Sequence, residues 1–248
     1  MKLLDFFQLH QKAALAFSGG VDSAYLLYAA LQCGASVRAY YVKSDFQPQF
    51  ELDDAQKLAA QLGADMTVIE ADALSLPEVA ANGADRCYHC KKLIMSAIAE
   101  AARADGFCEI MDGTNASDSA EDRPGMKALR ELAVLSPLKS CGLTKERIRQ
   151  LSREAGLFTW NKPAYACLAT RISTGERITK DKLKRTEAAE NFLFSLGFSD
   201  FRIRMAGNSA RIQAPAAQLG KVIEHRESIL KELKNYYDAL LLDLEARE

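Results

Sequence analysis

A short run of small and hydroxylated residues near the N-terminus has the composition of a phosphate-binding loop. Adjacent glycines permit a sharp turn and a close approach of the backbone to a ligand. Serine hydroxyls and successive backbone N–H groups at the start of a following helix would form a cradle for an anion. The run therefore predicts a nucleotide-phosphate site, and its residues are Phe17, Ser18, Gly19, Gly20, Asp22 and Ser23.

The pattern Ser-Gly-Gly-Val-Asp-Ser (18–23) differs from two common phosphate-binding loops. No lysine follows the glycines as in Gly-x-x-x-x-Gly-Lys-Ser/Thr, and the glycine spacing is not that of Gly-x-Gly-x-x-Gly. The pattern resembles the PP-loop of ATP pyrophosphatases, in which ATP is cleaved between its α and β phosphates. An ordinary glycine-rich turn that happens to carry serines is the alternative interpretation.

A Cys-x-x-Cys pair lies at the expected start of a helix, in Asp85-Arg-Cys-Tyr-His-Cys-Lys91. A helix N-terminus flanked by Arg86 and Lys91 favours thiolate at Cys87 and Cys90. Such a pair supports zinc, iron–sulfur or redox chemistry. A zinc site would need a second pair, and the other cysteines are scattered along the chain. Two buried thiols with only a packing role are the alternative.

Three further groups of residues could carry chemistry. Cys167 lies in a loop between Lys162 and Arg171, which makes it a candidate nucleophile or ligand, although a lone loop cysteine is usually inert. Arg202 and Arg204 alternate along one expected strand, so they share a face and could bind a phosphate or carboxylate; exposed surface charges are the alternative.

The third group is polar and follows the end of an expected strand, so it should face the nucleotide. It comprises Gly113, Thr114 and Asn115, within Asp112–Asp118, together with Arg123-Pro-Gly125. A solvated loop of turn-forming residues is the alternative interpretation.

The elements that must position these residues alternate between strand and helix. Apolar runs predict strands at 13–17, 36–42, 66–70 and 108–111, and helical spacing predicts helices at 24–31, 50–62, 88–102 and 145–155. This order predicts an α/β fold with a parallel sheet and helices on both faces. From residue 180 the order is helix, strand, strand, helix and strand, at 180–196, 201–205, 210–213, 215–235 and 239–243. We therefore expect domains at 1–176 and 177–248, the second a small α+β domain.

Composition excludes several classes of protein. The chain has 248 residues, 48% apolar and 26% charged, and a net charge of −1, which gives no electrostatic case for nucleic-acid binding. No apolar run reaches the ~20 residues that a membrane span needs. The start of the chain lacks the pattern of a signal peptide, so we expect a cytoplasmic protein with reduced cysteines.

Taken together, the motifs resemble the LarE family of ATP-dependent sulfur transferases. The matching stretches run in family order over nearly the whole chain. They are Ser-Gly-Gly-Val-Asp-Ser (18–23), Asp-Arg-Cys-Tyr-His-Cys-Lys (85–91), Asp-Gly-Thr-Asn (112–115), Arg-Pro-Gly (123–125), Ser-Pro-Leu (136–138), Gly-Leu-Thr-Lys (142–145), Cys-Leu-Ala-Thr-Arg-Ile (167–172) and Phe-Arg-Ile-Arg (201–204). The Cys-Leu-Ala-Thr-Arg segment separates this family from other PP-loop proteins.

The resemblance implies a PP-loop domain followed by a small C-terminal domain, in a homo-oligomer. It implies that ATP binds at the PP-loop, where Asp22 is also a catalytic residue, and that Mg²⁺ neutralises the pyrophosphate. It also implies that a carboxylate of pyridinium-3,5-biscarboxylate mononucleotide is adenylated. Sulfur would then displace AMP to leave a thiocarboxylate. By the same resemblance, Arg171, Arg202 and Arg204 would hold this nucleotide substrate.

The family uses two sources of sulfur. In some members one cysteine, at the position of Cys167, gives up its sulfur and becomes dehydroalanine. In others three cysteines hold a [4Fe–4S] cluster that delivers a bound sulfide. Since Cys87, Cys90 and Cys167 are all present, the cluster is the favoured expectation.

Other functions compete with this one. A tRNA thiolase or an amidating synthetase, such as NAD synthetase, would share the PP-loop. The net charge argues against tRNA, and amidation leaves Cys167 without a role. A non-catalytic sensor of ATP or AMP is the alternative outside the enzymes.

Overall fold

The computed structural model describes residues 2–118 and 124–247. Two compact units divide the chain: one contains Met1–Ala73 and Asp85–Lys162, and the other contains Leu74–Ala84 and Pro163–Glu248. This division differs from the expected domains 1–176 and 177–248. The loop with Cys167 and a short segment from the first half of the chain both belong to the second unit.

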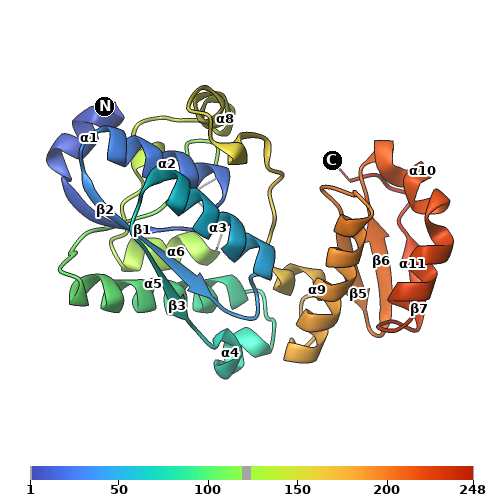
Figure 1. The fold of residues 1–248 in the computed structure, drawn as a ribbon. Helices are drawn as coiled ribbons and strands as arrows, with labels where there is room; N and C mark the ends of the chain where they lie inside the picture. The colour runs from blue at the N-terminus through green and yellow to red at the C-terminus, as the bar shows by residue number, and fades with distance from the viewer. Residues whose placement is uncertain (1, 119–123, 248) are drawn as a thin grey trace. The chain divides into compact units, whose positions relative to one another are not determined.

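The first unit is built on a parallel sheet of four strands, β1 (Lys12–Ala16), β2 (Ser36–Lys43), β3 (Met66–Glu70) and β4 (Ile110–Met111). The spatial order is β3-β2-β1-β4. The chain therefore places β2 and then β3 on one side of β1, and β4 later pairs with the other side of β1. Ligands of parallel α/β sheets bind at such a reversal, beyond the carboxyl ends of the strands. Here that point lies between β1 and β4. Figure 1 labels three of the four strands of this sheet, β1, β2 and β3.

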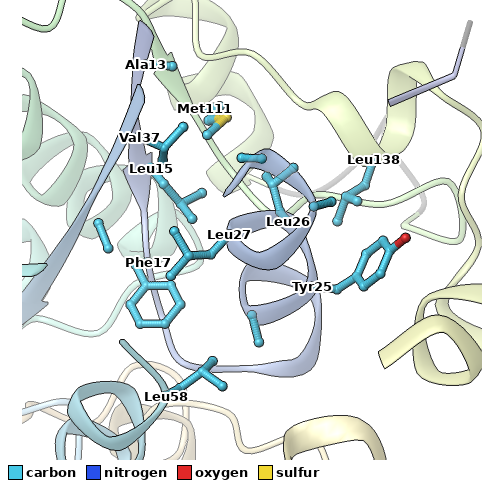
Figure 2. Close-up of a cluster of buried hydrophobic side chains, with 14 of the residues drawn as sticks. Ala13, Leu15, Phe17, Tyr25, Leu26, Leu27, Val37, Leu58, Met111 and Leu138 are labelled. Atoms are coloured by element: carbon cyan, nitrogen blue, oxygen red, sulfur yellow. The ribbon is translucent and has the colours of Figure 1, made fainter. Parts of the chain in front are cut away.

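Helices cover both faces of this sheet, as predicted. They are α1 (Leu3–Leu9), α2 (Val21–Gln32), α3 (Gln49–Leu62), α5 (Arg86–Ala104), α6 (Pro124–Glu131), α7 (Pro137–Ser140) and α8 (Lys145–Glu154). Ala13 and Leu15 of β1 point into a core with α2, part of which Figure 2 shows. Ala14, on the opposite face of β1, packs in a second core with α5 and α6. The alternation of strand side chains explains these two cores.

The second unit is a small α+β fold, as expected. It contains α9 (Lys180–Ser195), β5 (Arg202–Ala206), β6 (Ser209–Gln213), α10 (Ala216–Glu224), α11 (Arg226–Leu233) and β7 (Ala239–Leu242). Strands β5 and β6 are antiparallel, and β7 runs parallel to β6. The single helix predicted at 215–235 is wrong, because the chain leaves helical geometry at His225, where φ is −90° and ψ is 11°.

A segment that joins β3 to α5 packs with the second unit, and we call Leu74–Ala84 the strap. It contains the end of a 3-10 turn, η1 (Ala73–Ser75), and a short helix, α4 (Pro77–Ala80). Asn82 is 1% exposed, and its side-chain amide donates to the carbonyls of Ser173 at 2.9 Å and Glu176 at 3.1 Å. The Gly175 N–H donates in return to the Asn82 carbonyl at 2.8 Å. This segment was not expected from the sequence.

Among the described residues, none of the helices is both long and apolar enough to cross a membrane.

Candidate active site

The PP-loop connects β1 to α2 at the carboxyl edge of the sheet. Gly19 has φ = 70°, and a Cβ atom there would lie 3.0 Å from Ala55 Cβ and 3.1 Å from Ala55 Cα. Backbone conformation and the close packing of α3 therefore both require glycine. Gly20 is the N-cap of α2 and has no side chain to cap the first backbone N–H groups. These groups are consequently suited to bind an anion.

Serine hydroxyls close this loop on itself. Ser23, which is 3% exposed, accepts from the Ser18 N–H at 3.3 Å and donates to the Gly20 carbonyl at 3.2 Å. The hydroxyls of Ser18 and Ser23 are also hydrogen-bonded at 3.1 Å. Ser23 thus shapes the loop, whereas the expected role of these serines as phosphate donors stays a prediction.

Phe17 contributes through its backbone. Its ring is 3% exposed and lies in the core between the sheet and α2 (Figure 2). Its N–H donates to the Tyr40 carbonyl at 2.9 Å, which continues the pairing of β1 with β2 into the loop. The side chain is therefore part of the scaffold under the loop.

The loop after β4 contacts the first turn of α2. A Cβ atom at Gly113 would lie 2.9 Å from Ser23 N, and Asn115 Nδ2 donates to Asp22 Oδ1 at 3.3 Å. Residues expected from two separate motifs are thereby brought together at the β1/β4 reversal. Arg123, which the same interpretation included, lies outside the described residues.

Polar groups of the β4 loop are partly used to fix its own shape. The buried carboxylate of Asp112 accepts from Thr114 N at 3.1 Å, Thr114 Oγ1 at 2.6 Å and Ser136 Oγ at 2.8 Å. Asn115 is 2% exposed, and its side-chain oxygen accepts from Ser117 N at 2.8 Å. The loop is therefore a preorganised wall of the site.

Lys145 also lies in this group, a position that was not expected from the sequence. Lys145 Nζ lies 2.5 Å from Asp22 Oδ2, and its backbone N–H donates to Ser117 Oγ at 3.0 Å. It is the first residue of α8, whose N-cap is Thr144. A cation is unfavourable at a helix N-terminus, so its presence there was a signal that an anion lies nearby. Asp22 is that anion in this structure.

The Cys-x-x-Cys pair lies at the start of a helix, as predicted. Cys87 and Cys90 are in the first turns of α5, whose N-cap is Asp85. Cys87 is exposed, Cys90 is half-buried, and Arg86 Nη2 donates to Cys87 Sγ at 3.5 Å. The six cysteines of the chain, all described, are present as thiols.

Cys167 belongs to the second unit, where it precedes a 3-10 turn, η3 (Leu168–Arg171). Its side chain is half-buried, and its carbonyl accepts from Thr170 Oγ1 at 2.8 Å. Over residues 2–118 and 124–247, no group of three or more His, Cys, Asp or Glu side chains is arranged to hold a metal ion. The expected cluster site on Cys87, Cys90 and Cys167 therefore stays a prediction.

The three arginines expected at the substrate differ in exposure. Arg171 is 1% exposed and forms an ion pair with Glu190, with Nε 2.8 Å from Oε1. Arg202 is 5% exposed, and burial lowers its pKa to about 10, with the Arg171 and Arg247 cations adding to the shift. Arg204 is exposed on β5 opposite Arg211 of β6. Only Arg204 of the three presents its side chain to solvent in this unit, so the geometry favours it for contact with a ligand.

Comparison with known proteins agrees with this arrangement. A family model described as "Queuosine biosynthesis protein QueC" matches residues 12–86, which include the PP-loop. A protein of Synechocystis sp. with no function in its name is 35% identical over 90% of this chain and 83% of its own. The pyridinium-3,5-bisthiocarboxylic acid mononucleotide synthase of Lactiplantibacillus plantarum is 33% identical over 91% of this chain and 82% of its own. A protein of Methanocaldococcus jannaschii is 29% identical over 92% of this chain and 86% of its own.

The likeness to the Lactiplantibacillus synthase extends over both units, and the phosphate-binding loop lies where a parallel sheet binds nucleotides. The chain therefore belongs to the LarE family of ATP-dependent sulfur transferases, within the PP-loop ATP pyrophosphatase superfamily.

Proposed function

We propose that this protein adenylates a carboxylate of pyridinium-3,5-biscarboxylate mononucleotide and converts it to a thiocarboxylate, with release of pyrophosphate and AMP. The observation that supports this most is the meeting of the PP-loop, the β4 loop and Lys145 around Asp22, at the β1/β4 reversal of the sheet. The printed name of the Lactiplantibacillus relative supports the choice of substrate.

Adenylation requires charge stabilisation at the departing pyrophosphate. A carboxylate oxygen of the substrate attacks the α-phosphorus of ATP, and the bond to the bridging oxygen breaks as pyrophosphate leaves. The uncapped N–H groups at the start of α2 and the Lys145 ammonium are the groups that we assign to the pyrophosphate. A Mg²⁺ ion would neutralise its charge, and Asp22 offers the carboxylate oxygen that this cation prefers.

Sulfur transfer follows from the acyl adenylate, because AMP is a good leaving group whereas a free carboxylate is not. In the route that uses the cysteine sulfur itself, the Cys167 thiolate attacks the acyl carbon, AMP leaves and a thioester forms. Removal of the Cα proton of Cys167 then breaks its Cβ–S bond. The sulfur remains on the substrate as a thiocarboxylate, and Cys167 becomes dehydroalanine.

A second sulfur source fits the donor chemistry of the chain. Cys87, Cys90 and Cys167 are thiols, and none of the three is fully buried. A [4Fe–4S] cluster bound by three thiolates would supply a sulfide in place of the cysteine sulfur. We retain the cluster as the favoured source, since a single sacrificial cysteine gives no role to Cys87 and Cys90.

Arg204 is the arginine that we assign to the anionic groups of the substrate. It is exposed and lies directly opposite Arg211, so two cations share one face of the small sheet. The roles expected for Arg171 and Arg202 are less favoured, because both side chains are buried.

The function can be tested by following both products of ATP cleavage. Purified protein is mixed with ATP, Mg²⁺ and pyridinium-3,5-biscarboxylate mononucleotide, and we expect pyrophosphate, AMP and a nucleotide in which sulfur replaces one oxygen. Lys145→Met should slow pyrophosphate release on the order of a hundredfold. The proposal is wrong if pyrophosphate appears without any gain of sulfur, or if no pyrophosphate appears, which would favour a nucleotide sensor.

The sulfur source can be tested on the same protein, purified and reconstituted without oxygen. We expect the iron content of one [4Fe–4S] cluster per chain, and its loss in Cys167→Ala. A colourless protein that makes product once, with Cys167 lighter by one H₂S, would instead establish the sacrificial route. A salt-sensitive complex with tRNA would favour the tRNA thiolase alternative. The homo-oligomer and the cytoplasmic location stay predictions.

A further inference from the structure

The loop that carries Cys167 is held by its backbone carbonyl groups. Side-chain donors reach four of them: Arg202 Nη2 to Ala164 at 2.6 Å, Arg171 Nη1 to Ala166 at 2.9 Å, Thr170 Oγ1 to Cys167 at 2.8 Å and Arg204 Nη1 to Thr170 at 3.0 Å. Hydrogen bonds to charged groups are shorter and stronger than neutral ones. The backbone is thus fixed on both sides of Cys167 by arginines that come from η3 and β5.

One carboxylate, that of Glu190 on α9, organises this set of arginines. Glu190 is 1% exposed and accepts from Arg171 Nε at 2.8 Å, Arg171 Nη2 at 3.1 Å and the Ile203 N–H at 3.0 Å. The Tyr165 hydroxyl also donates to Glu190 Oε2. An ionised carboxylate offers about four acceptor positions, and four donors occupy them here. Glu190 therefore connects α9, β5 and both ends of the Cys167 loop.

The aromatic ring of Tyr165 makes the arrangement more rigid. The guanidinium carbon of Arg171 lies 4.6 Å from the ring centroid, and that of Arg202 lies 5.3 Å from it. Both cations therefore contact the ring, which is part of the loop that they hold. Burial favours the neutral form of Arg171, yet the hydrogen bonds and charge of Glu190 outweigh this and raise its pKa overall. Glu190 is thus the group that keeps a buried cation beside Cys167.

Given the sulfur transfer proposed above, on which this inference rests, we propose that Glu190 is the positioning residue for Cys167. It orients Arg171, and Arg171 fixes the carbonyl of Ala166, the residue before Cys167. A buried ion pair is weak evidence for stability, since apolar side chains could fill the same volume. A role in orienting the sulfur explains why charge is retained here, because a misplacement of 1 Å can cost about a hundredfold in rate.

The test is Glu190→Gln in the full-length protein, with two rates measured in a single turnover. The amide keeps the shape of the side chain, but its NH₂ group would face an Arg171 N–H that can only donate. We expect pyrophosphate release, which we assign to the first unit, to stay at the wild-type rate. Thiocarboxylate formation should fall on the order of a hundredfold. Glu224→Gln, an exposed glutamate of the same unit, should leave both rates unchanged.

A measurement that does not depend on catalysis separates this inference from the proposed function. Brief treatment with iodoacetamide, after removal of iron, is followed by mass analysis of the cysteine peptides. We expect the alkylation rate of Cys167 to change in Glu190→Gln relative to wild type, while that of the exposed Cys108 stays the same. An unchanged Cys167 rate would overturn the inference whatever the activity, whereas a wild-type protein that makes no thiocarboxylate would overturn only the proposed function.

A loss of both rates together would mean that Glu190 has only a structural role, and would also overturn the inference. If Glu190→Gln does not fold, as judged by circular dichroism, Tyr165→Phe replaces it. This variant keeps the ring that both guanidinium groups contact and removes one donor to Glu190. It should show the same selective loss of thiocarboxylate formation, to a smaller extent, and equal loss of both rates would contradict the positioning role.

Discussion

At position 113 the space around the backbone requires glycine. A Cβ atom there would lie 2.9 Å from Ser23 N and 3.2 Å from Ser23 Cα, both backbone atoms in the first turn of α2. Gly113→Ala must therefore move the β4 loop away from the PP-loop. We expect it to lower the free energy of unfolding by about 1–3 kcal/mol and to weaken ATP binding. Urea denaturation and titration calorimetry with ATP measure the two effects.

Gly220 supplies the matched control for this substitution. It lies inside α10, and apart from the adjacent residues and the backbone of the helix itself, no atom lies within 4 Å of the Cβ that alanine would add. Gly220→Ala should raise the free energy of unfolding by about 0.5–1 kcal/mol, because alanine favours a helix interior more than glycine does. Normal stability and ATP affinity in Gly113→Ala would show that the two loops do not need their close approach.

Lys145 illustrates which site residues the sequence could reveal. The PP-loop and the residues after β4 were predictable, because each motif is local and follows an apolar strand. The pair of Lys145 with Asp22 depends on α8 packing beside α2, and no local pattern encodes that contact. A basic residue directly after a threonine N-cap was the available signal, since it opposes the helix dipole.

Among the elements, the strap shows how one side chain can attach a segment to a distant part of the chain. Asn82 has φ = 59° and donates to the carbonyls of Ser173 and Glu176. Asn82→Gly keeps the left-handed backbone but removes these donors, which should lower the free energy of unfolding by about 1–3 kcal/mol. The free energy of unfolding of Asn82→Ala should be about 1–2 kcal/mol lower than that of Asn82→Gly, because alanine disfavours the left-handed conformation. Denaturant titration of both variants checks the order.

If Asn82→Gly unfolds at the same denaturant concentration as wild type, then the strap is held by its apolar contacts and the amide is unimportant. Equal stability of the glycine and alanine variants would remove the argument from backbone conformation, whatever the amide contributes.

The elements divide into those with local signals and those without them. Strands β2 and β3 and helix α8 were predictable because apolar runs or an N-cap define them in the sequence. The break at His225 was missed because apolar spacing continues from α10 into α11, and no glycine or proline lies at the break. The strap was missed because α4 has four residues and its contacts come from residues far along the chain.

At the scale of the whole molecule, the two units contain different parts of the chemistry. The PP-loop, the β4 loop and Lys145 belong to the first unit, and the Cys167 loop with its arginines belongs to the second. Each of these two groups of residues is held by contacts within its own unit. Adenylation and sulfur transfer should therefore be separable by substitutions in one unit or the other.

Asp22→Asn and Cys167→Ser test this separation in the full-length protein. Asp22→Asn removes the charge that pairs with Lys145, so pyrophosphate release and thiocarboxylate formation should both fall on the order of a hundredfold. Cys167→Ser should release pyrophosphate in the first turnover at the wild-type rate and form no thiocarboxylate, because a hydroxyl can neither supply sulfur nor replace the thiolate that would hold the cluster. Cys108→Ser, at an exposed cysteine of the first unit, should leave both steps intact. Loss of the pyrophosphate burst in Cys167→Ser would mean that adenylation itself depends on the second unit, contrary to the division drawn here.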